Sequence, residues 1–266
     1  MGARASGKSE KSLKEGVLNM GAIAALIVAI GIVALIFGGY KTWQAKKLAG
    51  APLAPTGDIV TKGDSVAGEK GAISAEGDVS CPKVLISPVT KTECIYYELK
   101  VEGSWKDGDS RKSKTYVEEK VAAGFTLDDG SGPVPVDASQ GGDFDCMEKT
   151  FSETKKEGLF ADLKSAVGKG EPMMFGEYPF ENPAMSKADT FECTEKLVKV
   201  PSRLYVCGKH AEGVVTSPGW TGLIMSTKSR DELLGSTQDT AKKTLMGGGI
   251  GIGVGIVLGI ISKLIA

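Results

Sequence analysis

Two long apolar runs lie near the ends of the chain and enclose a polar middle. Residues 20–39 form a run of 20 residues without a charged side chain, and residues 245–261 form a second such run of 17. At about 1.5 Å of rise per helical residue, a run of about 20 residues matches a hydrocarbon core of about 30 Å. The pattern therefore predicts one membrane-spanning helix near each end and a separate folded domain between them.

The flanks of the first run favour an uncleaved anchor. Basic residues precede it, and aromatic and basic residues typical of a membrane interface follow it: Arg4, Lys8, Lys11 and Lys14 before, and Tyr40, Lys41, Trp43, Lys46 and Lys47 after. The competing interpretation is a cleaved signal peptide, whose apolar region usually holds about 7 to 15 residues. Because the run is longer than that, we expect it to be retained.

Small residues repeat along both runs at a spacing that suits close helix packing. In the second run they are every fourth residue: Gly247, Gly251, Gly255 and Gly259. The first run has Gly21, Ala25 and Ala29 at the same spacing. Such a glycine zipper lets two helix backbones approach closely. We hypothesise that the two spans pack on each other or on copies of themselves. Packing on copies would make the protein a homo-oligomer. The alternative is that the glycines make the spans flexible without packing.

The side of the membrane that the domain faces is only weakly indicated. Two spans place both termini on one side, so basic residues of the tails compete with those that flank the domain. We count five in the tails and seven beside the domain, among them Lys228, Arg230, Lys242 and Lys243. This margin leans towards a cytoplasmic domain and leaves the sidedness undetermined.

The middle of the chain has the pattern of an antiparallel β domain. Short runs rich in β-branched and aromatic residues, separated by turn signals, lie at 72–80, 83–87, 94–101, 115–122, 125–127 and 134–137. A short strand is also expected at 58–62 and a short helix at 158–167. Ser229 and Glu232 form a capping-box pattern, so a helix leads from there towards the second run, although the polar residues 235–244 equally suit a break.

The predicted fold class is a membrane protein with two transmembrane α-helices flanking a mainly β (α+β) antiparallel domain that can close as a barrel. The expected organisation is a basic tail at 1–16, a first span at 17–40, a linker at 41–71, the β-rich domain at 72–228, a juxtamembrane segment at 229–243, a second span at 244–262 and a tail at 263–266. The chain is thus expected to be an integral membrane protein.

Composition excludes several classes of function. The 32 basic and 33 acidic residues leave no positive excess for nucleic acid. No two of the five cysteines have the two-residue spacing of paired zinc ligands: Cys81, Cys94, Cys146, Cys193 and Cys207. We expect buried, reduced cysteines; a single disulfide is the alternative if the domain faces an oxidising compartment.

Candidate catalytic and metal-binding residues are few. The run Asp128-Asp129-Gly130-Ser131-Gly132 suits a tight hairpin turn better than a calcium site, because it lacks the further carboxylates of an EF-hand loop. The single histidine, His210, is expected on the surface, and Cys146 has no recognisable base beside it. We therefore predict no catalytic, cofactor-binding or metal site, and keep a small hydrolase using Cys146 or His210 only as a remote alternative.

Two tryptophans lie in loop-like surroundings. Trp105 is followed by a basic cluster that includes Arg111, Lys112 and Lys114, and Trp220 lies between glycine and threonine. One interpretation is contact with lipid headgroups or a partner, since tryptophan combines an apolar ring with a polar handle. The other, which we favour slightly, is a tryptophan packed on the domain beside a solvated hairpin tip.

The order of the motifs resembles the GIDE, or "beside a membrane" (BAM), family. The resemblance covers about residues 17–262 and rests on the anchor, on Ser74-Ala75-Glu76-Gly77, on Ser87-Pro88-Val89-Thr90 with Tyr97, on residues 125–132, and on 204–208 and 223–229 before the second span. It singles out the following residues, which we expect to be structural: Glu76, Gly77, Ser87, Pro88, Tyr97, Asp128, Asp129, Gly130, Gly132, Gly208 and Ser226.

Ligases of that family carry a zinc-binding RING after the second span, and the resemblance would imply E3 ubiquitin transfer. Residues 262–266 hold no cysteine or histidine, so we expect no ubiquitin transfer by this chain alone. The expected function is a non-catalytic binding, sensing or scaffolding module at a membrane surface, with the lipid bilayer and an unidentified protein as partners. The alternative is a component of E3 ubiquitin ligase-like machinery that acts with a separate catalytic chain.

Overall fold

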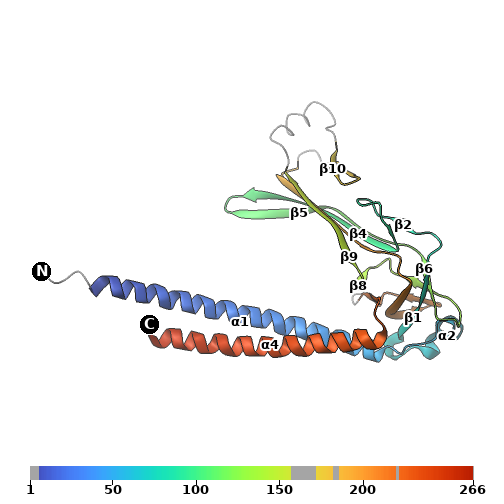
Figure 1. Cartoon of the computed structure of the whole chain (residues 1–266), viewed down its shortest axis with the longest axis horizontal. Helices are drawn as coiled ribbons and strands as arrows, with labels where there is room; N and C mark the ends of the chain where they lie inside the picture. The colour runs from blue at the N-terminus through green and yellow to red at the C-terminus, as the bar shows by residue number, and fades with distance from the viewer. Residues whose placement is uncertain (1–5, 157–171, 182–185, 220–221, 266) are drawn as a thin grey trace. The chain divides into compact units, whose positions relative to one another are not determined.

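The computed structural model describes residues 6–156, 172–181, 186–219 and 222–265. They form two compact units: a helical unit made from the two ends of the chain, and a β-rich unit of residues 50–230 (Figure 1). The expected helix at 158–167 and the side chain of Trp220 lie outside the described residues.

The helical unit is an antiparallel pair, α1 (Ser6–Gly50) and α4 (Arg230–Ile265), which lie side by side in Figure 1. Each contains one of the predicted apolar runs, and both helices are long and apolar enough to cross a membrane. Helix α4 begins next to Ser229 and continues without a break through residues 235–244. That segment contains no proline, so its polar residues do not interrupt the backbone hydrogen bonds of the helix.

A five-stranded barrel forms the centre of the β-rich unit. Its strands are β1 (Ala72–Ser80), β6 (Phe125–Asp128), β7 (Val134–Asp137), β13 (Arg203–Ala211) and β14 (Val214–Thr216). Their order is β1-β6-β7-β14-β13, and pairing of β13 with β1 closes the ring. All pairs are antiparallel except β7 with β14. In chain order this is a 1-2-3-5-4-1 arrangement with strands 3 and 5 parallel, the topology of OB-type barrels.

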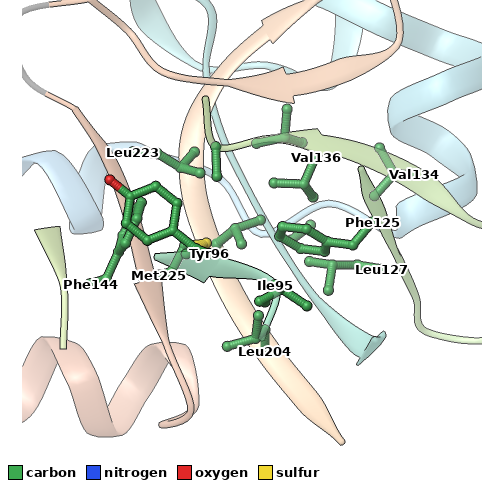
Figure 2. Packing of buried hydrophobic residues seen from close by; sticks show 14 of the residues in the cluster. Ile95, Tyr96, Phe125, Leu127, Val134, Val136, Phe144, Leu204, Leu223 and Met225 are labelled. Atoms are coloured by element: carbon green, nitrogen blue, oxygen red, sulfur yellow. The ribbon is translucent and has the colours of Figure 1, made fainter. Parts of the chain in front are cut away.

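The barrel core consists of inward side chains from alternating positions. Strand β7 shows the pattern most clearly, with Val134 and Val136 buried and the residues that follow each of them exposed. Figure 2 shows these two valines close to Phe125 and Leu127, which come from β6. In the same cluster the ring of Tyr96 meets that of Phe144 edge-on, at 4.8 Å between centroids. Alternation of this kind is what one buried and one solvated strand face require.

A second, antiparallel sheet is built from two insertions into the barrel. The segment between β1 and β6 contributes β4 (Tyr96–Asp107) and β5 (Ser110–Ala122), after the short β2 (Leu85–Ile86) and β3 (Glu93–Cys94). The segment between β7 and β13 contributes β9 (Glu148–Lys156) and β12 (Thr190–Val198). The order is β5-β4-β12-β9. One face of this sheet packs on the hairpin of β10 (Met173–Phe175) and β11 (Tyr178–Phe180), around Leu99, Phe180 and Phe191.

Two short strands complete the sheet that contains the barrel. Strand β15 (Leu223–Ser226) pairs with β13, and β8 (Gly142–Phe144) lies parallel to β15. The predicted fold class is therefore confirmed: two long apolar helices flank a mainly β unit that contains a barrel.

One predicted strand is wrong. Residues 58–62 belong to helix α2 (Thr56–Lys62), which is followed by the short 3-10 helices η1 (Gly63–Val66) and η2 (Glu69–Gly71). The β-branched residues there suggested a strand, but Pro55 fixes a φ suited to a helix start and Asp58 pairs with Lys62 one turn later at 2.8 Å. Ile59 is fully buried in the barrel cluster, so tertiary packing decides the conformation.

We expect Gly77→Ala to destabilise the β-rich unit by roughly 1–3 kcal/mol, the usual cost of overpacking. A Cβ atom at Gly77 would lie 2.7 Å from the backbone of Asp128 on the paired strand β6. Gly124→Ala is the matched control, because a Cβ there meets no atom within 4 Å. Urea unfolding of the full chain in detergent, followed by tryptophan fluorescence, measures both variants; equal midpoints would contradict the close approach.

Candidate functional site

A seam of small residues joins the two helices of the helical unit. Every seventh residue along α1 is small and buried, and the same is true of α4. The positions are Ala24, Gly31, Gly38 and Ala45 on α1, and Ala241, Gly248, Gly255 and Ser262 on α4. A seven-residue repeat keeps one face of a helix against its partner, and small residues let the two backbones approach.

The approach is close enough that larger side chains would collide. A Cβ atom built on Gly255 would lie 2.6 Å from Val28 Cγ2 and 3.0 Å from the carbonyl oxygen of Ala24. Across the same seam, Gly31 lies against the backbone of Gly248. At the far end, Gly21 lies opposite Ser262. These contacts fix the antiparallel register of α1 and α4.

The predicted glycine face matches this seam in part. Gly255 lies in the seam, and Gly251 and Gly259 flank it, with Cβ positions 3.7 Å from Gly31 and 3.9 Å from Ala24. Gly247 points away from α1, and the residue in its place is Gly248. On α1, Ala25 and Ala29 are exposed, and the contact runs through Ala24 and Gly31 instead. The difference arises because the seam repeats every seven residues, whereas the glycine pattern repeats every four.

Most residues singled out by the family resemblance lie at three sets of contacts that join separate segments of the β-rich unit, here called ties. Ser87 and Pro88 belong to the turn between β2 and β3; Asp128, Asp129, Gly130 and Gly132 form the turn between β6 and β7; and Glu76, Gly77, Gly208 and Ser226 lie on β1, β13 and β15. Tyr97 is half-buried against the core of the second sheet, and burial raises the pKa of its phenol.

The first tie is a carboxylate that the sequence analysis missed. Glu195 on β12 is completely buried and accepts hydrogen bonds from the Val89 backbone N–H at 2.8 Å and the Thr90 hydroxyl at 2.6 Å. The hydroxyls of Ser87 and Thr150 donate to it at 3.2 and 3.1 Å. Burying a carboxylate costs several kcal/mol unless donors of this kind surround it.

A signal for this glutamate was present in the sequence. Along β12 the inward positions are Phe191, Cys193, Glu195 and Leu197, so a charged residue stands at one core position of an alternating strand. Because Glu195 binds the turn at Ser87, it connects the two insertions that build the second sheet.

The second tie joins the β6–β7 turn to α2. The carboxylate of Asp129 accepts hydrogen bonds from the Thr56 hydroxyl at 2.7 Å and the Thr56 backbone N–H at 3.2 Å. Within the turn, Asp128 accepts the backbone N–H groups of Gly130 and Gly132 at 2.8 and 3.2 Å. Both glycines have positive φ, as a tight hairpin needs. The aspartates are thus occupied in holding the turn and the start of α2.

The third tie lies along the closure of the barrel. Glu76 on β1 pairs with Arg203 on β13, its Oε1 lying 3.1 Å from Arg203 Nε. On the neighbouring strand, the hydroxyl of Ser226 is buried and accepts the backbone N–H of Lys228 at 3.0 Å. Gly208 has the Thr216 carbonyl oxygen 2.4 Å from where its Cβ would be, so only glycine fits at this strand pairing.

The expectation of a surface histidine is wrong. The side chain of His210 is only 8% exposed, with Nδ1 lying 2.7 Å from the Asp64 carboxylate of η1. Its Nε2 accepts the backbone N–H of Gly213 at 2.9 Å. An accepting Nε2 places the imidazole proton on Nδ1, where it is donated to Asp64. His210 therefore ties η1 to the β13–β14 turn.

None of the five cysteines forms a disulfide in this structure; Cys94, Cys193 and Cys207 are buried as expected, whereas Cys81 and Cys146 are only partly buried. Burial raises the pKa of Cys146 to about 12, with a further contribution from Asp145. Burial likewise raises the pKa of Cys94 to about 11 and that of Cys193 to about 12. A thiol with a raised pKa is a poor nucleophile near neutral pH.

The basic cluster beside Trp105 forms the tip of the β4–β5 hairpin. Arg111 contacts Asp189 at 2.8 Å, and Lys112 pairs with Asp107. Trp105 itself is half-buried. Within the part of the chain that the structure describes, no group of three or more His, Cys, Asp or Glu side chains is placed to hold a metal.

No family model matches the chain, and no curated protein or solved structure is significantly similar to it.

We expect Asp129→Asn to make the stability of the protein less dependent on pH. Burial raises the pKa of Asp129, but hydrogen bonds from Ser131 and Thr56 outweigh burial and lower the pKa from 3.8 to about 2. Because the folded pKa is the lower one, the carboxylate stabilises the fold above about pH 4, and this contribution is lost as the pH falls towards 2.

Urea midpoints at several pH values between 7 and 2.5 measure this effect. The gap between the wild-type chain and Asp129→Asn should be largest at pH 7 and shrink on acidification, and it should be modest because Asp129 is exposed. Asp109→Asn at the exposed β4–β5 turn is the control for loss of charge. A gap that stays constant with pH would contradict the assignment.

We expect Gly255→Leu to separate the two helices and Gly253→Leu to leave them in place. A Cβ at Gly253 meets no atom within 4 Å, whereas one at Gly255 collides with α1. The readout is oxidative cross-linking of Gly21→Cys with Ser262→Cys in a chain without the native cysteines, since a Cβ at Gly21 would lie 3.8 Å from Ser262 Oγ. Cross-linking should fall several-fold with Gly255→Leu only; an equal effect of both leucines would contradict the seam.

Proposed function

We propose that this chain is an integral membrane protein with two spans, which displays its β-rich unit as a non-catalytic binding, sensing or scaffolding module at a membrane surface. The observation that carries the proposal is the distribution of apolar residues around the helix pair. Small residues face the partner helix, while large ones face outwards, including Leu26, Val33, Ile36, Ile250 and Val257 at 55% to 69% exposure.

This distribution is the reverse of a water-soluble helical hairpin, in which the large apolar residues would face each other. In lipid the reversal is stable, because outward leucine and isoleucine meet hydrocarbon and small residues permit close helix contact. Tyr40 and Trp43 follow the first apolar run and are partly exposed, as interfacial aromatic residues are.

The proposal of a non-catalytic role rests on how the polar groups of the β-rich unit are used. Glu195, Asp129 and His210 each bind segments of the unit itself. The resemblance to the GIDE family agrees with this role, because the residues that it singles out lie at structural ties. The alternative role in ubiquitin-like transfer has only the resemblance in its favour, and it requires the β-rich unit to face the cytoplasm.

The test is the topology of the chain in intact cells. Two spans require Asp109, at the β4–β5 turn, and Lys263, beyond the second apolar run, to lie on opposite sides of the membrane. Single cysteines introduced as Asp109→Cys or Lys263→Cys, in a chain without the native five, are treated with a reagent that cannot cross membranes. One position should react in intact cells and the other only after lysis.

Alkaline extraction provides the matching control, because a chain with two spans stays in the membrane pellet. Labelling of both positions on the same side, or release of the chain by alkali, would contradict the two-span arrangement. Labelling of Asp109→Cys in intact cells would in addition remove the ubiquitin-like alternative, whereas its protection would keep that alternative open.

A further inference from the structure

A groove with a basic rim lies between α1 and α4, beyond the end of their apolar segments. It has a volume of about 420 Å³. Each helix contributes four residues at positions i, i+3, i+4 and i+7: Thr42, Ala45, Lys46 and Ala49 from α1, and Gln238, Ala241, Lys242 and Leu245 from α4. Ala45 and Ala241 belong to the small-residue seam, so the groove is open because its floor has no large side chain.

The positive charge of the groove comes from the two lysines of its rim. Among the described residues, neither Lys46 nor Lys242 has an ion pair, whereas the nearby Lys41 donates to Gln44 at 2.7 Å. The nearest acidic residue on α4 is Asp239, which lies three residues before Lys242 and is its neighbour on the helix surface, although no ion pair joins the two side chains. Gln238 adds an amide donor at the same opening, so the groove offers two cations and a neutral donor to an anion.

The depth of the groove matches that of lipid headgroups. Lys242 precedes Leu245 by three residues, about 4.5 Å along the helix. Lys46 follows residue 39, the end of the first apolar run, by about 10 Å. The headgroup layer on each side of the hydrocarbon core is about 5–7 Å thick. The long lysine side chains reach along the helices, so both ammonium groups can lie within this layer.

We propose that this groove binds the phosphate headgroup of an anionic phospholipid, held by Lys46 and Lys242, with the start of an acyl chain lying along Leu245. The inference rests on the proposed membrane insertion of the helix pair and adds a specific lipid site to it. Charge complementarity selects the occupant: a basic groove between helices at this depth attracts anionic headgroups at about 1 kcal/mol per cation.

A second groove in the same helix pair serves as a contrast. It has a volume of about 470 Å³ and is lined by Gly21, Ala24, Ala25, Val28, Ala29, Ile32, Gly255 and Gly259. None of these side chains carries a charge or a polar group, so this groove can accept an acyl chain and has no means of selecting a headgroup.

The experiment uses the full chain in nanodiscs of phosphatidylcholine with a minor fraction of phosphatidylglycerol. Native mass spectrometry counts the lipids of each class that remain bound on release. We expect phosphatidylglycerol to be enriched over its bulk fraction in the wild-type chain. Lys46→Gln and Lys242→Gln should each reduce the enrichment about fivefold, the factor that about 1 kcal/mol represents, and higher salt should reduce it as well.

Lys243→Gln is the matched control, because it removes the same charge one residue from Lys242 and does not line the groove. Glutamine is a good helix former, so all three variants keep the helices. An equal loss with Lys243→Gln would overturn the proposal in favour of diffuse attraction to the basic region. Displacement of the bound lipid by millimolar inorganic phosphate would overturn it in favour of a soluble anion.

Insertion of the chain into the nanodisc and its preference for phosphatidylglycerol are measured separately in the same preparation. A chain that inserts in phosphatidylcholine nanodiscs and shows no enrichment of phosphatidylglycerol would overturn the headgroup site alone. A chain that fails to insert would overturn the proposed membrane anchoring together with this site.

Discussion

Pairing of β1 with β13 is the contact on which the rest of the β-rich unit depends. It joins residues 72–78 to residues 203–209, more than 120 positions apart, and it converts a row of strands into a closed barrel. Bringing such distant segments together has a large entropic cost, which the buried barrel core must offset. The ion pair between Glu76 and Arg203 joins these two strands. Gly77 on β1 and Gly208 on β13 allow the backbones of the neighbouring strands to approach closely. Both insertions begin and end at strands of this barrel, and their strands pair with each other as the second sheet.

The two units use apolar residues in opposite ways. In the barrel, large side chains such as Phe125 and Leu127 point inwards and fill the core. In the helix pair, many large side chains point outwards, and small residues on each helix pack against larger ones such as Val28 on the other. Water drives the first arrangement, whereas close packing without competition from water suits the second. This difference is what the proposed membrane insertion of the helix pair requires, because lipid and water favour opposite placements of large apolar side chains.

Polar side chains in the β-rich unit act as ties between segments that are distant in sequence. Glu195 holds the turn at Ser87, Asp129 holds the start of α2, and His210 holds η1 against the β13–β14 turn. Each of these groups would be a candidate for chemistry if it faced an open cleft. Their donors and acceptors are used within the unit, which supports the proposal that the protein acts through a binding surface. The proposed headgroup site between α1 and α4, with Lys46 and Lys242 at its rim, would be one such surface.

Local sequence patterns determined the element types wherever one periodicity dominated. The two apolar runs, the strands at 72–80, 125–127 and 134–137, and the turn at Asp128 to Gly132 were predictable because length, alternation and positive φ are local properties. Helix α2 was not, since its β-branched residues suggest a strand and burial of Ile59 decides otherwise. Tertiary structure alone decided the barrel closure, the partners of Glu195 and His210, and which small residues form the seam. Those features depend on which distant segments pair and in which register, and the pattern of apolar and polar residues in one sequence does not specify either.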